Sequence, residues 1–418
     1  MSGRRETAPH SALTMWTSSF RWLLAGRLVS FLGTSIAPVA LVFAVIDIDS
    51  SATALGMVLA ARTIPMTLFI LIGGVIADRF SRSRILVIAH VSSAATQAVA
   101  AWLLVSGNAT IGNLMVVEGL NGIAVAFALP ALNSVVPMVV DREHLQRANA
   151  VLSMTRHGAF ILGPSIAAGM VVTIGAGWGL ALDAGCYVLA AVCMAVLRLN
   201  RATNNDQPQE TGVLSELRSG WSAFASRQWV WAVVGAFTVV NMVEACVIVT
   251  LGPVVASRTF GEVGWGIAMS AEAIGFLAAS ALLVLVSLRR PLRAGMIAML
   301  GTVPAMLVLG ISPEAWMFIA ASTLAGFSME IFGVGWFTAL HEKIPEHLMS
   351  RVSSYDALGS FIAVPVGQLL AGPATAAFGV ERTIVGGALI SLVAILSAIA
   401  APQVRSLTLG PSEEAAPP

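Results

Sequence analysis

Long apolar stretches separated by short polar segments dominate this chain of 418 residues. Most of these stretches have the roughly 20 residues that an α-helix needs to cross a bilayer core about 30 Å thick. Gly and Pro recur inside them, which is common in membrane helices because neighbouring helices satisfy the freed backbone groups. The pattern predicts an all-α membrane protein with 12 transmembrane helices, at residues 20–46, 52–77, 84–106, 110–138, 148–175, 178–198, 228–256, 263–287, 292–311, 315–340, 350–377 and 381–401.

The composition agrees with a chain whose solvent is lipid. Hydrophobic residues make up 57% of the sequence and charged residues 11%, whereas soluble domains carry about 25% charged residues. This composition excludes a water-soluble enzyme, and the net charge of +1 excludes a nucleic-acid binder. The three cysteines fall in apolar runs, so we expect no disulfide, no metal site and no cofactor. The phosphate-binding pattern G-x-x-x-x-G-K-[ST] is absent from the sequence, which argues against ATP hydrolysis by this chain.

Basic residues gather in alternate connecting segments. With the N-terminus placed inside the cell, 18 of the 23 basic residues fall in cytoplasmic segments, and Arg258 and Arg382 fall in outer loops. Because cytoplasmic loops of membrane proteins are enriched in Lys and Arg, both termini are expected in the cytoplasm. Scarce lysine beside abundant Ala, Val and Gly suggests a GC-rich bacterial genome, and hence a multi-pass protein of the bacterial cell membrane.

The two halves of the chain resemble one another. An offset of 210 residues aligns Gly56 with Gly266, and offsets of 203 and 209 align further short matches. Since near-equal offsets indicate a duplicated unit, the sequence predicts two six-helix bundles in parallel topology. The N-terminal bundle would cover residues 1–198 and the C-terminal bundle residues 228–418. The polar segment 199–227 would be a cytoplasmic linker with an amphipathic helix, or alternatively the helical start of the seventh span.

The segment between the second and third spans carries a known pattern. Residues 73–84, GGVIADRFSRSR, resemble the loop signature G-x-L-A-D-R-x-G-R-K of the major facilitator superfamily. The matching positions are Gly74, Ala77, Asp78, Arg79 and Arg82. Ser81 and Ser83 stand where the signature has Gly and Lys. Stretches within 51–65 and 128–151 resemble the drug:proton antiporter branch, which includes macrolide and siderophore exporters, and the resemblance covers essentially the whole chain.

This resemblance implies two pseudo-symmetric six-helix bundles that move a small molecule across the bilayer by alternating access, as a monomer. In the family the signature is a gating loop on the cytoplasmic side. Asp78 would face the positive N-terminus of the eleventh span. Arg79 and Arg82 would pair with acidic residues such as Asp141. The alternative is that the arginines only fix the topology, which would leave Asp78 unexplained.

The fifth span contains HGAFILGPSIAAG, which resembles the exporter signature G-x-x-x-G-P-x-x-G-G at Gly163 and Pro164. Ala167 and Ala168 replace two glycines that are usual in this signature. Small residues allow close helix packing, which the family places between spans 5 and 8. The pattern favours export, and generic helix packing is the alternative.

Ionisable residues inside the spans require a reason, since each costs about 2.5–3.5 kcal/mol at the bilayer centre. The candidates for proton coupling are Glu118, Glu244, Glu272 and Glu330, and the candidates for charge pairing are Arg62, Arg156 and Asp356. Glu118 stands where many proton-coupled relatives have arginine. A buried carboxylate can carry a proton, or it can form a static pair with Arg62 or Arg156. Arg156 and Glu272 are estimated to lie at a similar depth in the bilayer. We therefore expect them to form an ion pair across the interface between the two halves.

Aromatic side chains on the spans that line the family's central cavity would give an adaptable apolar lining. They are Phe31, Phe127, Phe237, Phe332 and Trp336. Such a lining suits hydrophobic or amphiphilic compounds that are neutral or cationic. We therefore expect proton-coupled efflux of a drug, antibiotic or natural product, with a siderophore or other metabolite exporter, or an importer, as the alternative. A membrane-embedded enzyme is disfavoured because the sequence has no H-x-x-x-D motif and no metal-ligand set.

Overall fold

The computed structural model describes residues 16–79, 81–140, 144–197, 221–222, 224–286, 288, 290–345, 352, 355–356 and 359–407. The regular elements within these ranges are helices. Twelve helical segments among the described residues are long and apolar enough to cross a membrane. This confirms the predicted all-α membrane class and the predicted number of spans.

The first six spans are single helices. They are α1 (Ser18–Ile48), α2 (Ala52–Arg79), α3 (Arg82–Val105), α4 (Ile111–Val139), α5 (Leu145–Ile174) and α6 (Ala176–Val196). Side chains fix some of these boundaries. The Thr17 hydroxyl accepts a hydrogen bond from the Phe20 backbone N–H at 3.1 Å where α1 begins. Thr110 and Asn113 form a reciprocal capping box where α4 begins.

Two of the later spans are interrupted. The seventh span consists of α8 (Gln228–Glu244), the π-helical turn η2 (Ala245–Leu251) and α9 (Gly252–Arg258). The ninth span consists of α11 (Pro291–Ala298), the 3₁₀ turn η3 (Met299–Thr302) and α12 (Val303–Ile311). Pro253 and Pro304 are the second residues of α9 and α12, and proline lacks the N–H that a continuous helix requires. The remaining helices are α10 (Gly261–Leu285), α13 (Ala315–Lys343), α15 (Ala363–Phe378), α16 (Val380–Ala400) and the short α17 (Pro402–Ser406).

Two equivalent one-residue turns show the relation between the halves. Gly175 joins α5 to α6 with a φ of 94°, and Gly379 joins α15 to α16 with a φ of 80°. This backbone region favours glycine, which has no Cβ. The two glycines are 204 residues apart, close to the repeat offsets found in the sequence. The same kind of turn therefore connects the fifth span to the sixth and the eleventh span to the twelfth.

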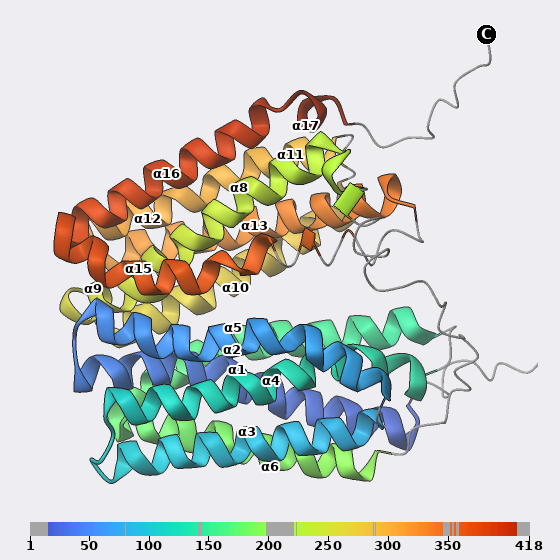
Figure 1. Cartoon of the computed structure of the whole chain (residues 1–418), viewed down its shortest axis with the longest axis vertical. Coiled ribbons are helices and arrows are strands. Elements are labelled where there is room, and N and C mark those ends of the chain that lie inside the picture. Colours follow the sequence, from blue (N-terminus) through green and yellow to red (C-terminus); the bar gives the residue numbers. More distant parts are fainter. Residues whose placement is uncertain are drawn as a thin grey trace, which may run out of the picture.

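Figure 1 shows α1 to α6 as one bundle and the helices from α8 onwards as a second bundle beside it. The bundles meet along two helix pairs, α2 with α15 and α5 with α10. The end of the molecule that holds Arg79, Val196 and Gln228 is named the linker end. The opposite end, which holds Ile48 and Ile174, is named the far end.

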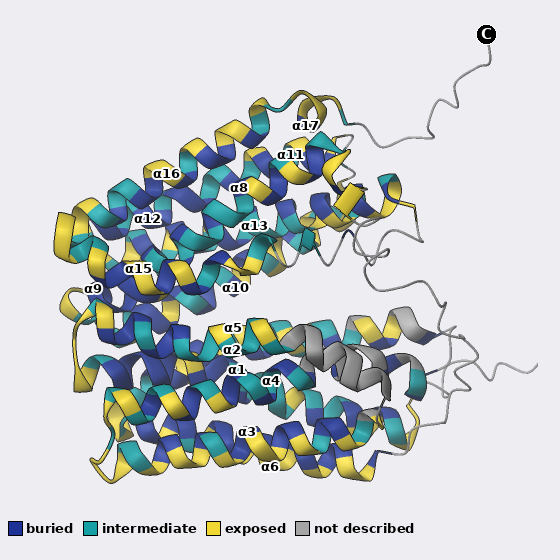
Figure 2. Ribbon diagram, viewed as in Figure 1, coloured by how far each residue is buried: buried dark blue, intermediate teal, exposed yellow. Residues whose placement is uncertain are grey.

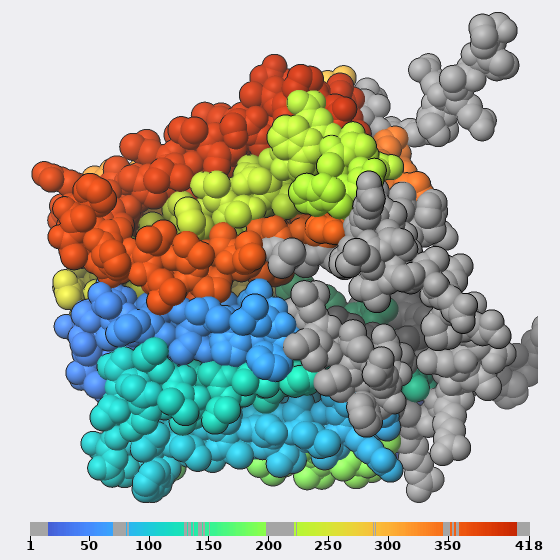
Figure 3. All heavy atoms as spheres, in the orientation of Figure 1, coloured from blue at the N-terminus to red at the C-terminus, as the bar shows by residue number. Residues whose placement is uncertain are grey.

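Glycines bring the two bundles into close contact. A Cβ at Gly56 of α2 would overlap the Gln368 carbonyl of α15. A Cβ at Gly266 of α10 would overlap the Pro164 carbonyl of α5. Figure 3 shows α2 and α15 in contact on this face of the molecule. These contacts join the halves in the part of the spans that leads to the far end.

Large apolar side chains cover the outside of both bundles. Val284 and Leu285 are 85% and 84% exposed, and Trp102 is 63% exposed. Figure 2 shows exposed residues along the outward faces of helices from both halves. So much exposed apolar surface is unfavourable in water and favourable in lipid. The structure therefore supports a multi-pass membrane protein.

The predicted amphipathic helix at 199–227 lies mostly outside the described residues. Within it, the rings of Trp221 and Phe224 stack with their centroids 5.6 Å apart. Both rings contact Tyr355, at 5.6 Å and 5.9 Å. These aromatic contacts attach the end of the segment to the C-terminal bundle.

Candidate functional site

A buried ion pair occupies the interior of the N-terminal bundle. Arg62 on α2 and Glu118 on α4 approach to an N–O distance of 3.5 Å, and the Glu118 side chain is fully buried. Gln97 on α3 donates a hydrogen bond of 3.4 Å to the other carboxylate oxygen. Three helices therefore converge on one carboxylate. For Glu118 the structure shows the static alternative, in which a buried acid is compensated by an arginine.

A second buried acid, Asp183 on α6, belongs to the same region, although the sequence analysis did not single it out. It is 1% exposed, and the charge of Arg62 acts on it. Gly33 on α1 makes room for it, since a Cβ at Gly33 would overlap the Asp183 carboxylate. Asp183 is the one charged residue within α6, and this isolation in an apolar run was the signal available in the sequence.

Two carboxylates share a small cavity inside the C-terminal bundle. Glu244 at the end of α8 and Glu272 on α10 both line a cavity of about 30 Å³. Their charges act on each other. Within the described part of the chain, neither carboxylate forms an ion pair. A cavity of this size can hold one water molecule. The C-terminal bundle therefore concentrates two acids in a small cavity whose described lining contains no cation.

Hydroxyl groups complete this cavity. Ser322 on α13 is 2% exposed and makes no hydrogen bond to the residues that the structure describes. Thr302 in η3 donates to the Met299 carbonyl at 2.8 Å. Glu244 directly precedes the π-helical turn η2, and such turns are frequent at functional sites. The lining thus offers polar groups that a bound water or a proton can use.

A larger cavity lies between the bundles at the linker end. Its volume is about 710 Å³, and it is lined by Arg156 of α5 and by residues of α13 that include Glu330, Phe337 and His341. Ser280 of α10 donates a hydrogen bond to Glu330. Because α5 and α13 belong to different halves, both bundles contribute to the lining of this cavity. Its lining therefore includes Arg156, a candidate for charge pairing, and Glu330, a candidate for proton coupling.

The far end is closed by polar contacts as well as by the glycines. The Arg258 guanidinium of the C-terminal half donates to the Ser50 carbonyl of the N-terminal half at 3.4 Å. Deeper in the interface, the hydroxyls of Ser165 on α5 and Ser270 on α10 are 2.8 Å apart. Among the described residues, the halves are therefore in contact toward the far end, and the cavity lined by Arg156 and Glu330 lies toward the linker end.

The predicted pair between Arg156 and Glu272 is not formed in this conformation. Arg156 lies 18 residues from the far end of α5, about 27 Å at about 1.5 Å per residue. Glu272 lies 11 residues from the far end of α10, about 16 Å by the same rise. Ser270 faces α5, and Glu272, about 200° further around the helix, faces Gly326 of α13. The prediction failed because it assigned the two residues the same depth and could not orient the helix.

Three of the aromatic residues predicted to line a cavity form a stack in the core of the C-terminal bundle. Phe237 stacks on Phe332 with the ring centroids 4.1 Å apart. Phe332 and Trp336 are 7% and 4% exposed. The Trp336 indole N–H donates to Asp356 at 3.0 Å and the Ser360 hydroxyl donates to it at 3.4 Å, and no described arginine pairs with this carboxylate. In this conformation these residues pack the bundle instead of lining an open space.

The two aromatic candidates of the N-terminal bundle have other neighbours. Phe31 lies under the Arg27 guanidinium, 5.1 Å from the ring centroid. Phe127 meets Phe69 edge to face, with centroids 6.2 Å apart. A cation–π contact of this kind helps to keep an arginine inside a bilayer.

The gating-loop residues Gly74, Asp78 and Arg79 belong to the last two turns of α2, and Arg82 is the first residue of α3. Their side chains lie outside the described part of the structure, as does Asp141. The contacts expected for this loop therefore stay predictions.

The packing expected of the fifth span is present. Gly163 lies against Ser35 of α1, where a Cβ would overlap the serine hydroxyl. One residue later, the Pro164 carbonyl contacts Gly266 of α10, and Ala168 contacts the same glycine. Small residues on α5 thus let it pack closely against α1 on one side and against α10, the eighth span, on the other.

Solved transporters have the same fold. A bacterial homologue of the human lysosomal transporter Spinster, in an inward-facing and unoccupied conformation, superimposes with a TM-score of 0.72 at 15% identity. The match covers 95% of this chain and all of that one. The nucleoside transporter NupG superimposes with a TM-score of 0.69 at 13% identity over 94% of this chain and all of its own. At this level of identity, the likeness concerns the fold alone.

Sequence relatives are efflux proteins. Macrolide efflux protein A of Streptococcus pyogenes is 25% identical over 394 residues, which cover 91% of this chain and 95% of the relative. Multidrug efflux pump Tap of Mycobacterium tuberculosis is 26% identical over 407 residues, 94% of this chain and 95% of the relative. The sequence profile of the Major Facilitator Superfamily matches residues 23–364. The matched region runs from the first span into the eleventh, so the chain belongs to the Major Facilitator Superfamily.

Proposed function

We propose that the protein exports hydrophobic or amphiphilic small molecules in exchange for protons by alternating access. The names of the macrolide and multidrug efflux relatives support export. The observation that carries the coupling to protons is that Glu244 and Glu272 share a cavity the size of one water molecule. Neither carboxylate forms an ion pair with a described residue. A buried carboxylate without a counter-cation is costly in a bilayer unless it takes up a proton.

Helix contacts connect Glu244 and Glu272 to the interface between the halves. Two ionised carboxylates in one small cavity repel each other, and a single proton between them removes the repulsion. Glu244 continues directly into η2, and η2 packs against α15. Helix α15 forms the interface with α2, and Gly367 of α15 also lies against the Met242 carbonyl of α8. Protonation of the pair therefore acts on the helices that carry the closed far-end contact.

The contacts at the far end and the cavity at the linker end support alternating access. The topology expected from the basic residues places the linker end in the cytoplasm. The cavity lined by Arg156 and Glu330 would then receive substrate from the cytoplasm, as an exporter requires. Opening the far end requires separation of Ser165 from Ser270 and of Gly56 from Gln368. The loop with Asp78 and its arginines would close the linker end in that second state.

The proposal is tested by transport in proteoliposomes, with erythromycin and the lipophilic cation tetraphenylphosphonium as probes. An imposed pH gradient should drive the uptake of at least one probe into inverted vesicles, and a protonophore should abolish it. Glu272→Gln should lower this pH-driven rate by about tenfold or more, since a charge in the bilayer no longer has to be neutralised. The exposed carboxylate of Glu381 provides the matched control, and Glu381→Gln should transport like the wild type. Transport that is indifferent to the protonophore, or unchanged in Glu272→Gln, would contradict proton coupling through this pair.

A further inference from the structure

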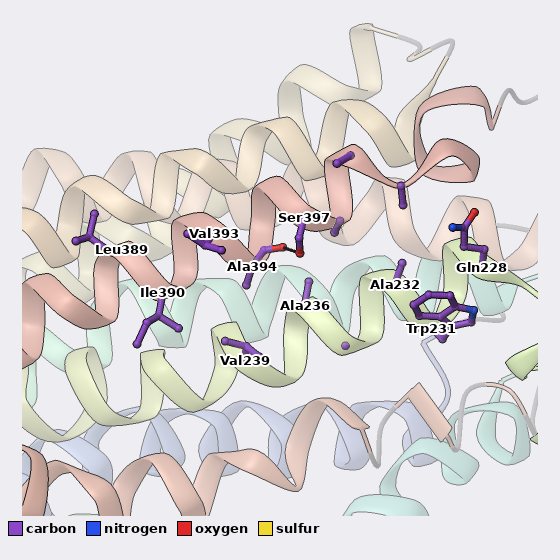
Figure 4. A pocket seen from close by; sticks show the side chains of 14 residues that line it. Gln228, Trp231, Ala232, Ala236, Val239, Leu389, Ile390, Val393, Ala394 and Ser397 are labelled. Atoms are coloured by element: carbon purple, nitrogen blue, oxygen red, sulfur yellow. Dashed lines mark hydrogen bonds between the residues drawn. The ribbon is translucent and has the colours of Figure 1, made fainter.

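A long apolar groove runs along the outside of the C-terminal bundle. It has a volume of about 870 Å³ and lies between α8 and α16 (Figure 4). Small residues form its floor because the facing sides of the two helices carry alanine and glycine: Ala232, Gly235, Ala236, Ala394 and Ala398. Larger apolar side chains form its rim, among them Trp231, Leu389, Ile390 and Val393. The groove shares no lining residue with the Arg156–Glu330 cavity and plays no part in the proposed transport path.

The groove has the length of one lipid leaflet. Along α16 it extends from Leu389 to Ala401, which corresponds to about 18 Å at about 1.5 Å per residue. This is close to half of a hydrocarbon core about 30 Å thick. A partner helix that crosses the membrane would require a groove of the full thickness, whereas the acyl chains of a lipid require one leaflet. The length and the apolar walls therefore favour a lipid as the occupant.

The end of the groove at the linker end is polar and basic. Gln228 lines it there, and the Trp229 backbone N–H donates to the Gln403 side-chain oxygen at 3.1 Å, which fastens α17 to α8. Arg405 of α17 donates from Nε to the Ile399 carbonyl at 3.0 Å. This hydrogen bond holds the exposed Arg405 charge beside the groove-lining Ala400 and Ala401.

We propose that this groove is a binding site for an anionic phospholipid. The acyl chains lie on the alanine and glycine floor between α8 and α16, and the phosphate group lies at the linker end near Arg405. Arginine binds phosphate through charge-assisted hydrogen bonds, and basic residues at the membrane surface attract anionic lipids. The bound lipid would link the seventh span, the twelfth span and α17.

The test measures lipid binding by native mass spectrometry of the purified full-length protein. The probes are phosphatidylglycerol and phosphatidylcholine with identical acyl chains. The wild type should bind phosphatidylglycerol about tenfold more tightly than phosphatidylcholine, and Arg405→Gln should remove most of this difference. Gly235→Phe should fill the groove and weaken the binding of both lipids, since open space surrounds the position where its Cβ is added.

Gly185→Phe is the matched control. Gly185 is an exposed glycine on α6, and open space likewise surrounds its Cβ position. This variant should bind both lipids like the wild type. Equal binding of the two lipids by the wild type would overturn the role of the basic end, and unchanged binding in Gly235→Phe would overturn the groove as the site. Competition by soluble glycerol phosphate at the same concentration would identify a phosphate site instead of a lipid site. A dimer that is lost in Gly235→Phe, without a change in lipid binding, would show that a second copy of the chain occupies the groove.

Discussion

The two bundles have the same architecture, but the partners of their buried carboxylates differ. In the N-terminal bundle, Glu118 is paired with Arg62 and hydrogen-bonded by Gln97, and the charge of the same arginine acts on Asp183, although no ion pair joins these two residues. In the C-terminal bundle, Glu244 and Glu272 share a cavity and have no ion pair among the described residues. The repeat offset of 210 residues makes the contrast sharp, because it aligns Arg62 of one half with Glu272 of the other.

This difference separates two uses of charge inside a membrane. A compensated carboxylate holds helices together, and removing either partner leaves a charge in a low-dielectric environment. An uncompensated pair of carboxylates gains from protonation and can therefore respond to the proton gradient. The N-terminal bundle thus resembles a fixed frame, and the C-terminal bundle contains the part that we propose to titrate.

The largest expected effect comes from breaking the compensated pair. Arg62→Met should lower the free energy of unfolding by about 3–5 kcal/mol, because Glu118 then remains buried without a compensating positive charge. Chemical denaturation in detergent measures this change. The double variant Arg62→Met with Glu118→Gln should recover most of the loss. An Arg62→Met protein as stable as the wild type would show that the pair is not structural.

A smaller effect is expected at Asp356, a half-buried acid of the C-terminal bundle that accepts hydrogen bonds from Trp336 and Ser360. Trp336→Phe removes the indole N–H and should cost about 1.5–3 kcal/mol of stability, typical for a hydrogen bond to a charged group. The same denaturation assay measures it. Trp231→Phe on the outer surface is the control and should have a negligible effect, since that indole is half exposed. Equal losses in the two variants would mean that the contact with Asp356 contributes nothing specific.

The difference between the two bundles can also be abolished by placing a cation in the cavity of Glu244 and Glu272. Met269 lines the cavity of the acid pair, and Met269→Lys would supply a counter-charge like that of Arg62. The variant should fold but lose about tenfold or more of its pH-driven transport, since a paired carboxylate no longer needs a proton. Met269→Leu, which keeps the volume and adds no charge, should transport normally. Full activity in Met269→Lys would contradict the role of the uncompensated pair.

The smallest expected effect concerns the hydroxyl in the cavity. Ser322→Ala removes a buried polar group that has no hydrogen-bond partner among the described residues, so stability should change by less than about 1 kcal/mol. The pH at which transport is half-maximal should nevertheless shift, because the hydroxyl can bind a water or a proton beside the acids. Thr323→Ser on the same helix is the control, as Thr323 bonds to the Ile319 carbonyl instead. An unchanged pH profile in Ser322→Ala would remove this hydroxyl from the site.

The sequence predicted the fold because the relevant signals are local. Twelve apolar runs, the repeat offset and the small residues after Gly163 anticipated the spans, the halves and the packing of α5 on α10. The interruptions of the seventh and ninth spans were not anticipated, although Pro253 and Pro304 lie directly beside them. Prolines are tolerated in membrane helices, and their presence alone therefore does not indicate a break.

The partners of the charged residues could not be predicted from the sequence in the same way. Glu272 was expected to face α5, but a rotation of about half a turn relative to Ser270 directs it toward α13. Asp183 was overlooked because a single carboxylate in an apolar run gives no information about its neighbours. Pairing depends on helix rotation and on which helices are adjacent, and neither is encoded in the spacing along one span.

The most direct test of the central claim is infrared spectroscopy of the reconstituted protein during a pH titration. A protonated carboxylic acid has a C=O stretching band that a carboxylate lacks. The account predicts a titrating band that corresponds to one proton per molecule and that disappears in both Glu244→Gln and Glu272→Gln. The same band should persist in the double variant Arg62→Met with Glu118→Gln. A band that survives both substitutions in the C-terminal bundle but is lost in the N-terminal double variant would contradict the account, since it would place the exchangeable proton in the other half.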